Sequence, residues 1–490
     1  MKKKLLYPIA FALNAFLILY SCSAEEEDTT PPPSIIQTPE PEPPVQNQNS
    51  IYNVEKSLVN INVANERDLD HVTELFGPMG IASSIVYQNE TGTYLLAPGV
   101  VTCFNGECNN VDSAVEIVPS SSYLMKKENG EWKLHKKLDN LSTWGIRNTV
   151  LKDDFFVLGD GNEIGNNWKG HLWFGEIIDS EIKINKISTD ETASYFHCVA
   201  MGDLNNDGLL DLGGAPGRDS GENGAMDYII YLQTSKNNFE LLELNSFIEY
   251  TNERYEMSNF SINFSDLDND NVDEIIVCGK YLSVLSFNEQ NNKFEVVWNA
   301  SHESLYPEVS INDSFWGTSI KVADFNNDGI KDISIAREGL PHNGIGQTTF
   351  EVWIGNGDKA FEPRFVQKYP DSKFMFREFE LLDVNNDSFI DIVLRTNGLN
   401  SGAKSSEYQI DVNDIRKGIK IDELIWINDG TGHFNKYFQE DFNLEGVYPR
   451  KLIPYIENNE LHLVGSIKNV VQKGNGSIDI EFFDITLTIQ

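Results

Sequence analysis

Oxygen-bearing side chains recur at a fixed spacing in four short segments of this chain. The segments are DLNNDGLLD from Asp203, DLDNDNVDE from Asp266, DFNNDGIKD from Asp324 and DVNNDSFID from Asp383, here called loops 1 to 4. Each has Asp or Asn at positions 1, 3 and 5 and an acid at position 9, and their first residues lie 63, 58 and 59 residues apart. Ca²⁺ is a hard cation that takes about six to eight oxygen ligands in a flexible shell. The repeated pattern therefore predicts about four calcium sites on a repeated structural unit.

The ligands expected in each loop are the side chains of positions 1, 3, 5 and 9 and the carbonyl oxygen of position 7. Loop by loop they are Asp203, Asn205, Asp207, Leu209 and Asp211; Asp266, Asp268, Asp270, Val272 and Glu274; Asp324, Asn326, Asp328, Ile330 and Asp332; and Asp383, Asn385, Asp387, Phe389 and Asp391. Position 6 must turn sharply with a positive φ, which suits Gly208 and is tolerated by Asn271. Ser388 suits this position less well, so we expect loop 4 to be the weakest site.

The loops differ from EF-hands. An EF-hand carries a bidentate Glu at position 12 and has a helix on each side, whereas position 12 is Gly214, Val277, Ile335 or Leu394. The flanking segments are short and rich in β-branched residues, which indicates strands. Each loop is therefore expected to join two antiparallel strands. The alternative is four solvated Asn/Asp turns without metal, and four copies in register favour the metal.

A longer pattern surrounds each loop. Residues 315–361 read as strand, loop, strand, long connection, strand, Asn/Gly turn and strand. This unit resembles the FG-GAP or VCBS repeat, the blade of integrin-α-like β-propellers. Trp316-Gly317 stands for its aromatic-Gly element, Gly214-Ala215-Pro216 for its GAP element, and residues 426–434 (WINDGTGHF) for its outer hairpin. The resemblance covers residues 194–440 and implies four-stranded blades with calcium loops.

Strand patterns outside that range predict further blades. Residues 80–137, 141–188 and 448–490 each show several short apolar runs separated by turn residues. With the four calcium-loop blades they make seven, a usual propeller number, although six or eight remain open. A strand near residues 58–63 could close the ring against the last blade. The expected fold is an all-β, seven-bladed β-propeller with calcium loops in the central blades.

The N-terminus has the pattern of an export signal. Three lysines precede an apolar run over residues 5–20, which is too short for a comfortable membrane span. The run ends in Leu19-Tyr20-Ser21-Cys22, which resembles the lipobox of bacterial lipoproteins and implies lipidation of Cys22. The acidic residues that follow resemble the export signal of surface lipoproteins in Bacteroidetes-type bacteria. The alternative is cleavage and secretion without a lipid.

These features divide the chain into three parts. Residues 1–22 are expected to be a lipoprotein signal peptide, residues 23–50 a Pro/Glu-rich tether, and residues 51–490 the propeller. The resulting expectation is an outer-membrane protein, anchored by its N-terminal lipid and displayed at the cell surface.

The remaining cysteines fit an exported protein. Cys103 and Cys108 flank Asn105-Gly106, a strong two-residue hairpin signal, and would face one another in a non-hydrogen-bonded pair. A disulfide can span that separation, so we expect one there. Cys198 and Cys278 lie in expected strands and should be buried free thiols.

The net charge of −37 excludes nucleic acid as a favoured partner, because phosphate binding needs a basic surface. The FG-GAP resemblance places the calcium loops on one face and the connections after each second strand on the other. Those connections are expected over residues 159–170, 213–227, 336–348 and 395–420. The candidate ligand-binding residues in them are Trp168, Arg218, Asp219, Glu222, His342, Arg395 and Lys404. Trp144 and Trp316 each precede a Gly at the same point of a blade, which favours packing between blades over sugar stacking.

No nucleophile elbow, HExxH, Walker or GxGxxG motif occurs in the sequence. We therefore expect a binding or adhesion module for a glycan or a protein partner rather than an enzyme. Two alternatives remain open: a polysaccharide lyase assembled from distant loops, and a structural subunit of an envelope complex.

Overall fold

Every regular element that the structure describes is a β-strand. The computed structural model describes residues 52–62, 84–100, 121–138, 141–143, 149–162, 168–178, 181–194, 196–216, 228–242, 261–279, 281–288, 290, 293–301, 305–306, 315–339, 348–369, 374–399, 424–437, 452–466, 471–473 and 477–489. Within these ranges no helix is long and apolar enough to cross a membrane. The described residues all belong to the compact unit that covers residues 44–490.

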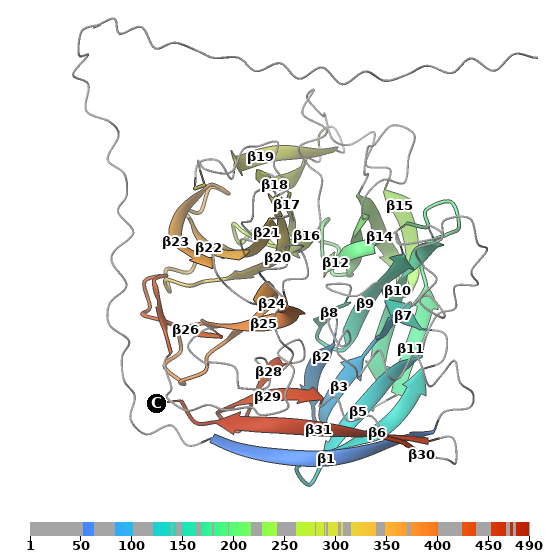
Figure 1. The fold of residues 1–490 in the computed structure, drawn as a ribbon. Coiled ribbons are helices and arrows are strands. Elements are labelled where there is room, and N and C mark those ends of the chain that lie inside the picture. The colour runs from blue at the N-terminus through green and yellow to red at the C-terminus, as the bar shows by residue number, and fades with distance from the viewer. Residues whose placement is uncertain are drawn as a thin grey trace, which may run out of the picture. The chain divides into compact units, whose positions relative to one another are not determined.

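Seven sheets of four or five strands form the blades of a β-propeller (Figure 1). Blade 1 holds β2 (Ile85–Asn89), β3 (Gly92–Ala97), β5 (Ser122–Glu128) and β6 (Glu131–Leu138), and blade 2 holds β8 (Thr149–Lys152), β9 (Phe155–Asn162), β10 (Trp168–Ile178) and β11 (Glu181–Lys186). Blade 3 holds β12 (Phe196–Gly202), β13 (Asp211–Pro216), β14 (Ile229–Ser235) and β15 (Asn238–Leu242). Blade 4 holds β16 (Ser261–Ser265), β17 (Glu274–Cys278), β18 (Tyr281–Asn288) and β19 (Lys293–Ser301).

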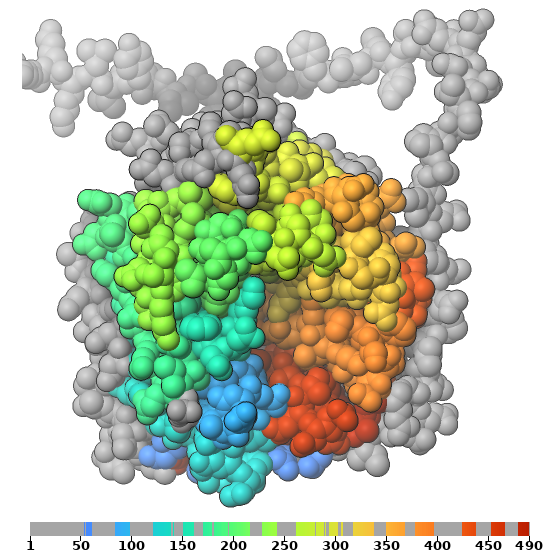
Figure 2. Space-filling view, turned by 180° about the vertical axis from the view of Figure 1, so that it is seen from behind, coloured from blue at the N-terminus to red at the C-terminus, as the bar shows by residue number. Residues whose placement is uncertain are grey.

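The other three blades complete the ring. Blade 5 holds β20 (Phe315–Ala323), β21 (Asp332–Gly339), β22 (Thr348–Gly355) and β23 (Phe361–Tyr369), and blade 6 holds β24 (Phe374–Leu382), β25 (Asp391–Leu399), β26 (Ile425–Asn428) and β27 (Phe434–Lys436). Blade 7 holds β28 (Ile453–Glu457), β29 (Glu460–Ser466), β30 (Val471–Lys473), β31 (Ser477–Leu487) and β1 (Tyr52–Asn62). A short parallel pair, β4 (Gly99–Val100) and β7 (Ser142–Thr143), stands apart from the blades. The space-filling view shows the blades following one another in chain order (Figure 2). The expected all-β, seven-bladed fold is confirmed.

Burial explains the strand patterns within a blade. All five residues of β17 (EIIVC) are buried, because an inner strand is covered on both faces by neighbouring blades. The outermost strand β11 (EIKINK) instead alternates exposed and more buried residues, because one of its faces meets water. The core is thus a set of apolar layers between adjacent blades, which fixes their spacing and angle.

The ring closes because the N-terminal strand β1 pairs with a strand of the last blade. β1 pairs antiparallel with β31 from Tyr52 opposite Leu487 to Asn62 opposite Ser477, and the two lie side by side in Figure 1. The closing strand expected near residues 58–63 is therefore confirmed, and it begins earlier than expected. Lys127 of blade 1 adds an ion pair to Asp484 of β31, with 3.0 Å between Nζ and Oδ2.

The close approach of blades 4 and 5 explains one glycine. A Cβ atom built on Gly317 in β20 would overlap the sulfur of Cys278 in β17. This is the glycine of the aromatic-Gly element, so that element marks a contact between blades. Cys278 and Cys198 are both buried free thiols, as the sequence predicted. The side chains of Trp144 and Trp316, and the whole of Cys103 and Cys108, lie outside the described residues.

Candidate metal site

Loops 1 to 4 occupy the same place in four consecutive blades. Each connects the first strand of its blade to the second: β12 to β13, β16 to β17, β20 to β21, and β24 to β25. The strand pairs are antiparallel and begin directly at position 9 of each loop. The predicted strand–loop–strand placement is therefore confirmed in blades 3 to 6.

A shared hydrogen-bond pattern gives all four loops the same shape. In loop 3 the carboxylate of Asp324 accepts the backbone N–H of Asp328 at 3.2 Å and of Gly329 at 2.8 Å. The carboxylate of Asp328 accepts the N–H of Ile330 at 2.8 Å. The same three bonds occur in the other loops. Because the carboxylates at positions 1 and 5 hold the backbone, their oxygens gather inside the turn.

Two positions of each loop adopt a left-handed backbone conformation. At position 6, φ is 78° for Gly208, 67° for Asn271, 83° for Gly329 and 72° for Ser388, as expected. Position 4 is also left-handed, with φ between 55° and 62°, and it is Asn in every loop: Asn206, Asn269, Asn327 and Asn386. Asn tolerates this conformation better than other side chains except Gly. The repeated Asn at position 4 is therefore a sequence signal for this conformation, and a prediction based on the oxygen ligands alone does not include it.

Replacing Ser388 with Gly is expected to stabilise the protein by about 0.5–1 kcal/mol, because Gly removes the cost of a left-handed Ser at position 6. The reciprocal change Gly329→Ser in loop 3 should destabilise by a similar amount. A Cβ at Gly329 meets no atom within 4 Å, so only backbone strain is tested. Urea unfolding of both variants in chelator measures the effect, and equal stabilities would contradict it.

The acid at position 9 links each loop to its blade. Asp332 is fully buried, and its carboxylate accepts the N–H of Phe325 in loop 3 at 2.7 Å and that of Gly355 at the end of β22 at 2.9 Å. Asp211 and Asp391 make the equivalent pairs of bonds. A carboxylate has about four lone-pair positions, so two remain for a cation. This residue therefore joins loop, second strand and third strand around the prospective metal.

These buried acids predict a pH dependence in metal-free protein. Burial raises the pKa of Asp211 and Asp391 to about 7 and that of Asp332 to about 6, from an ordinary value of 3.8. Between the ordinary pKa of 3.8 and these raised pKa values, the folded state binds more protons than the unfolded state. The stability that these groups contribute is therefore lost as pH rises through that range. Calcium favours the ionised form, so the gain in melting temperature on adding calcium should grow from about pH 5 to about pH 7.5. Thermal melts in calcium and in chelator test this, and a constant gain would contradict it.

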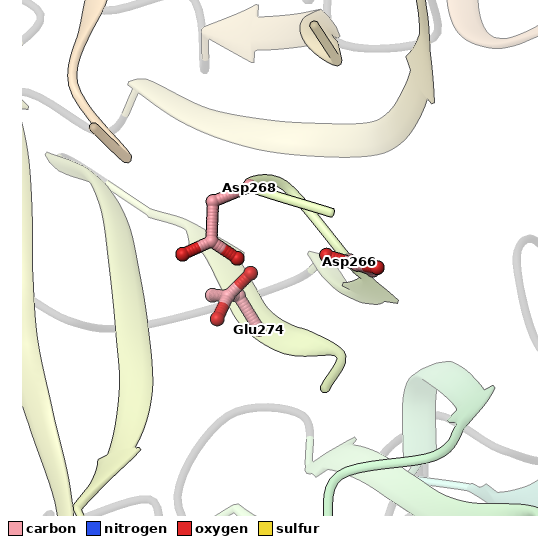
Figure 3. A group of neighbouring side chains, drawn as sticks. All are labelled: Asp266, Asp268 and Glu274. Carbon is pink, nitrogen blue, oxygen red and sulfur yellow. The ribbon is translucent and has the colours of Figure 1, made fainter. Parts of the chain in front are cut away.

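Loop 2 brings three acids together (Figure 3). One oxygen each of Asp266, Asp268 and Glu274 lie within 4.8 Å of one another. The Oδ1 atom of Asp268 is buried and has no hydrogen-bond partner, as expected of an oxygen placed for a cation. The set contains only oxygen ligands, which suits a hard cation such as Ca²⁺. The residues present therefore fit the metal that the sequence predicted.

The other three loops have Asn at position 3 in place of Asp268. Each of these amides donates its Nδ2 to the position-5 carboxylate, at 3.1 Å in loop 1, 2.8 Å in loop 3 and 2.8 Å in loop 4. The amide Oδ1 still faces the turn, where it accepts the N–H of position 5. In these three loops the side-chain oxygens of positions 1 and 3 therefore meet at the backbone N–H of position 5.

One residue expected on the ligand-binding face occupies a different environment. Arg395 lies in β25, which continues to Leu399, so the expected loop start at residue 395 is wrong. Its side chain is buried, with Nη1 at 3.2 Å from Glu378 and 3.1 Å from Glu380. The loop was expected from the Gly-, Asn- and Ser-rich segment 395–420, whereas carboxylates on β24 compensate the charge of Arg395 within the sheet.

Of the other candidates for the ligand-binding face, the structure describes Trp168. Trp168 is the first residue of β10, where its backbone pairs with Asn162. The neighbouring strands run further than expected, to Asn162 in β9, Pro216 in β13 and Gly339 in β21. Five candidates and the lipidation site lie outside the described residues: Arg218, Asp219, Glu222, His342, Lys404 and Cys22.

A family model matches the part of the chain that carries this geometry. Residues 266–335 match the FG-GAP-like repeat. The match begins at the first residue of loop 2 and ends within β21, so it spans both loop 2 and loop 3.

Two solved structures are also similar to the chain. The chain is similar to an exotype rhamnogalacturonan lyase, YesX, at 12% identity and a TM-score of 0.27, over 79% of this chain and 71% of that one. It is also similar to Saccharomyces cerevisiae Sqt1, at 12% identity and a TM-score of 0.38, over 86% of this chain and 98% of that one. No curated protein sequence matches the chain. Neither structural likeness assigns an activity to it.

Proposed function

We propose that this protein is a calcium-stabilised β-propeller that acts as a binding module for a macromolecule. The observation that supports the proposal best is one pattern of loop hydrogen bonds repeated in four consecutive blades, together with the acids of positions 1, 3 and 9 that lie close together in loop 2. A cation at each loop would tie together the strands that position 9 already connects. Such ions would stiffen a scaffold, which is what a binding surface made of loops requires.

Calcium suits the loops better than other common metals. Their ligands are carboxylate, amide and carbonyl oxygens, and Ca²⁺ accepts such ligands in a flexible coordination shell that need not be octahedral. Magnesium would require stricter geometry and would keep more water. We propose about four ions, one for each loop.

The ligand would bind at the end of the blades opposite the metal. In blades 3, 5 and 6 the second strand starts at a calcium loop, so its far end leads into the connection to the third strand. Those connections contain five of the candidate residues: Arg218, Asp219, Glu222, His342 and Lys404. Calcium and ligand would then act at separate ends of the same rigid strands. The ligand we propose is a glycan or a surface protein.

The proposed location is the cell surface, with the lipid of Cys22 as anchor and residues 23–50 as tether. Loops of this kind in extracellular modules bind calcium at roughly 0.1–1 mM, which extracellular media supply. The N-terminal motifs support this placement. A surface lipoprotein needs a stable domain outside the cell, and metal loops meet that need without many disulfides.

The test of the proposed function is retention of residues 51–490 on immobilised polysaccharides of several classes in millimolar calcium. Retention on one class, lost in the variant Arg218→Ala/Asp219→Ala, would support glycan binding at the predicted end. The matched control is Lys236→Ala in the β14–β15 turn of blade 3, which should bind normally. Absence of retention on every glycan, with specific cross-links to surface proteins on intact cells, would select the protein partner. Release of unsaturated sugars would contradict a pure binding module and favour the lyase alternative.

A further inference from the structure

A lysine from blade 5 reaches into the metal loop of blade 4. Lys359 lies in the turn between β22 and β23, and its Nζ is 2.8 Å from Glu274 and 3.0 Å from Asp268. The same ammonium donates to the hydroxyl of Ser286 in β18 at 3.0 Å. Its side chain is only 16% exposed. Two of the three acids gathered in loop 2, Asp268 and Glu274, are therefore already paired with the ammonium group of Lys359.

The charge of loop 2 matches this arrangement. Loop 2 has an acid at positions 1, 3, 5 and 9, whereas loops 1, 3 and 4 have Asn at position 3. The extra carboxylate is that of Asp268, which is one of the two acids that contact Lys359 most closely. At positions 1, 3, 5 and 9 alone, one ammonium offsets the fourth carboxylate of loop 2 and leaves the charge that three carboxylates give the other loops; Asp273 at position 8 is a further acid of loop 2. Lys359 thus compensates the one loop that carries a surplus negative charge.

The backbone at Lys359 gives a second, independent observation. Its φ is 57°, a conformation that side chains with a Cβ rarely adopt. The turn between β26 and β27 in blade 6 has the same hydrogen bond, from Asp429 N–H to the carbonyl of His433, as Asn356 N–H to Ala360 in blade 5, each at 3.0 Å. The position equivalent to Lys359 is there Gly432, with φ of 80°.

The two turns also face the preceding blade in the same way. A Cβ on Gly432 would lie 2.9 Å from the Cδ1 atom of Ile354 in blade 5, and the side chain of Lys359 projects into blade 4. The strained lysine therefore stands where the sister turn needs glycine. Its contacts with loop 2 account for a side chain at this position.

We propose that Lys359 is a tethered cation of the loop 2 metal site. Its ammonium holds Asp268 and Glu274 when no metal is bound and so fastens loop 2 of blade 4 to blade 5. A calcium ion that enters loop 2 must share or take over these carboxylates, so loop 2 binds calcium more weakly than it would without the lysine. The inference rests on the proposed calcium binding. It predicts that loop 2 depends less on calcium for its structure than loops 1, 3 and 4 do.

The test compares Lys359→Met with wild-type protein, both as residues 51–490. Terbium luminescence and calcium titration measure affinity, and thermal melts in chelator measure the metal-free state. Lys359→Met should bind one ion about fivefold more tightly, because a competing charge is gone. It should also melt at a lower temperature in chelator. The gain in affinity should disappear when Asp266→Asn disables loop 2.

Two further variants separate this effect from general damage. Lys236→Met removes an exposed lysine of the β14–β15 turn, whose Nζ lies 2.9 Å from Glu176 of blade 2, a blade that has none of the four loops, and it should leave calcium affinity unchanged. Asp268→Asn/Lys359→Met restores the charge balance, so its melting temperature in chelator should exceed that of Lys359→Met alone. Calcium affinity in Lys359→Met equal to or weaker than wild type would overturn the inference while leaving the proposed calcium binding intact. Absence of calcium binding in wild-type protein would instead overturn the proposed function.

Discussion

Removal of calcium is expected to lower the melting temperature of residues 51–490 by about 10 °C. At ten times its Kd, each site adds about 1.4 kcal/mol to the free energy of unfolding. Four independent sites therefore add about 6 kcal/mol, and each kcal/mol shifts the melting temperature of a domain of this size by about 1–2 °C. Thermal unfolding followed by circular dichroism, in calcium and then in chelator, measures the shift.

The control for this prediction is the choice of metal. Restored calcium should recover the original melting temperature, whereas magnesium at the same concentration should recover less, because these loops do not provide its octahedral geometry. The variant Asp324→Asn should reduce the calcium-dependent shift by about a quarter or more, since it disables one of four loops and loop 3 carries neither Ser388 nor a competing lysine. A melting temperature that is the same in chelator and in calcium would contradict the metal assignment.

Glu351→Gln is expected to destabilise the propeller by about 3–5 kcal/mol, because it leaves a buried guanidinium without its counter-charge. Arg337 and Glu351 are both fully buried, with 2.6 Å between Nε and Oε1. Arg337 also donates to the carbonyl of Gly279 in blade 4 at 2.8 Å, and Trp353 donates to the second carboxylate oxygen at 2.9 Å. The pair thus joins blade 5 to blade 4 near the ends of β21 and β17 that lie away from loops 2 and 3.

Urea unfolding measures this loss, and two variants calibrate it. The double variant Arg337→Met/Glu351→Met should recover most of the stability, because apolar residues of similar volume replace a buried pair without leaving a charge. Glu128→Gln breaks the pair with Lys133, in which both side chains are about half exposed, and should cost under about 1 kcal/mol. Equal losses for Glu351→Gln and Glu128→Gln would show that the buried pair is not what holds blades 4 and 5 together.

Local features of the fold could be predicted from the sequence because their causes are local. The four loops repeat one spacing, so their place between first and second strands and the left-handed position 6 followed directly. The closing strand was also predictable. Its apolar pattern comes before the first blade, and the last blade offers a sheet edge with which it can pair. The left-handed Asn at position 4 was present in all four loops as well and could have been predicted from the same repeat.

Contacts between blades could not be predicted in this way, because they join residues far apart in the chain. Lys359 reads as an ordinary turn residue, and only the ring places it 2.8 Å from Glu274. Arg395 reads as the start of a loop, yet it donates to the carbonyl of Ser84 in a different blade at 2.9 Å. The position-9 acids were expected only as metal ligands, whereas each also holds the third strand of its blade. Charge compensation of this kind depends on tertiary structure and leaves no periodic signal.

The number of bound calcium ions tests the central claim most directly. Residues 51–490 would be dialysed to equilibrium against calcium at about ten times Kd, and the bound ion would be the excess of calcium on the protein side, measured by elemental analysis. The same measurement would be made on Asp203→Asn, Asp266→Asn, Asp324→Asn and Asp383→Asn. The account predicts about four ions per chain in the wild-type protein and one fewer in each variant. A protein that retains no calcium, or a count that none of the four substitutions changes, would contradict it.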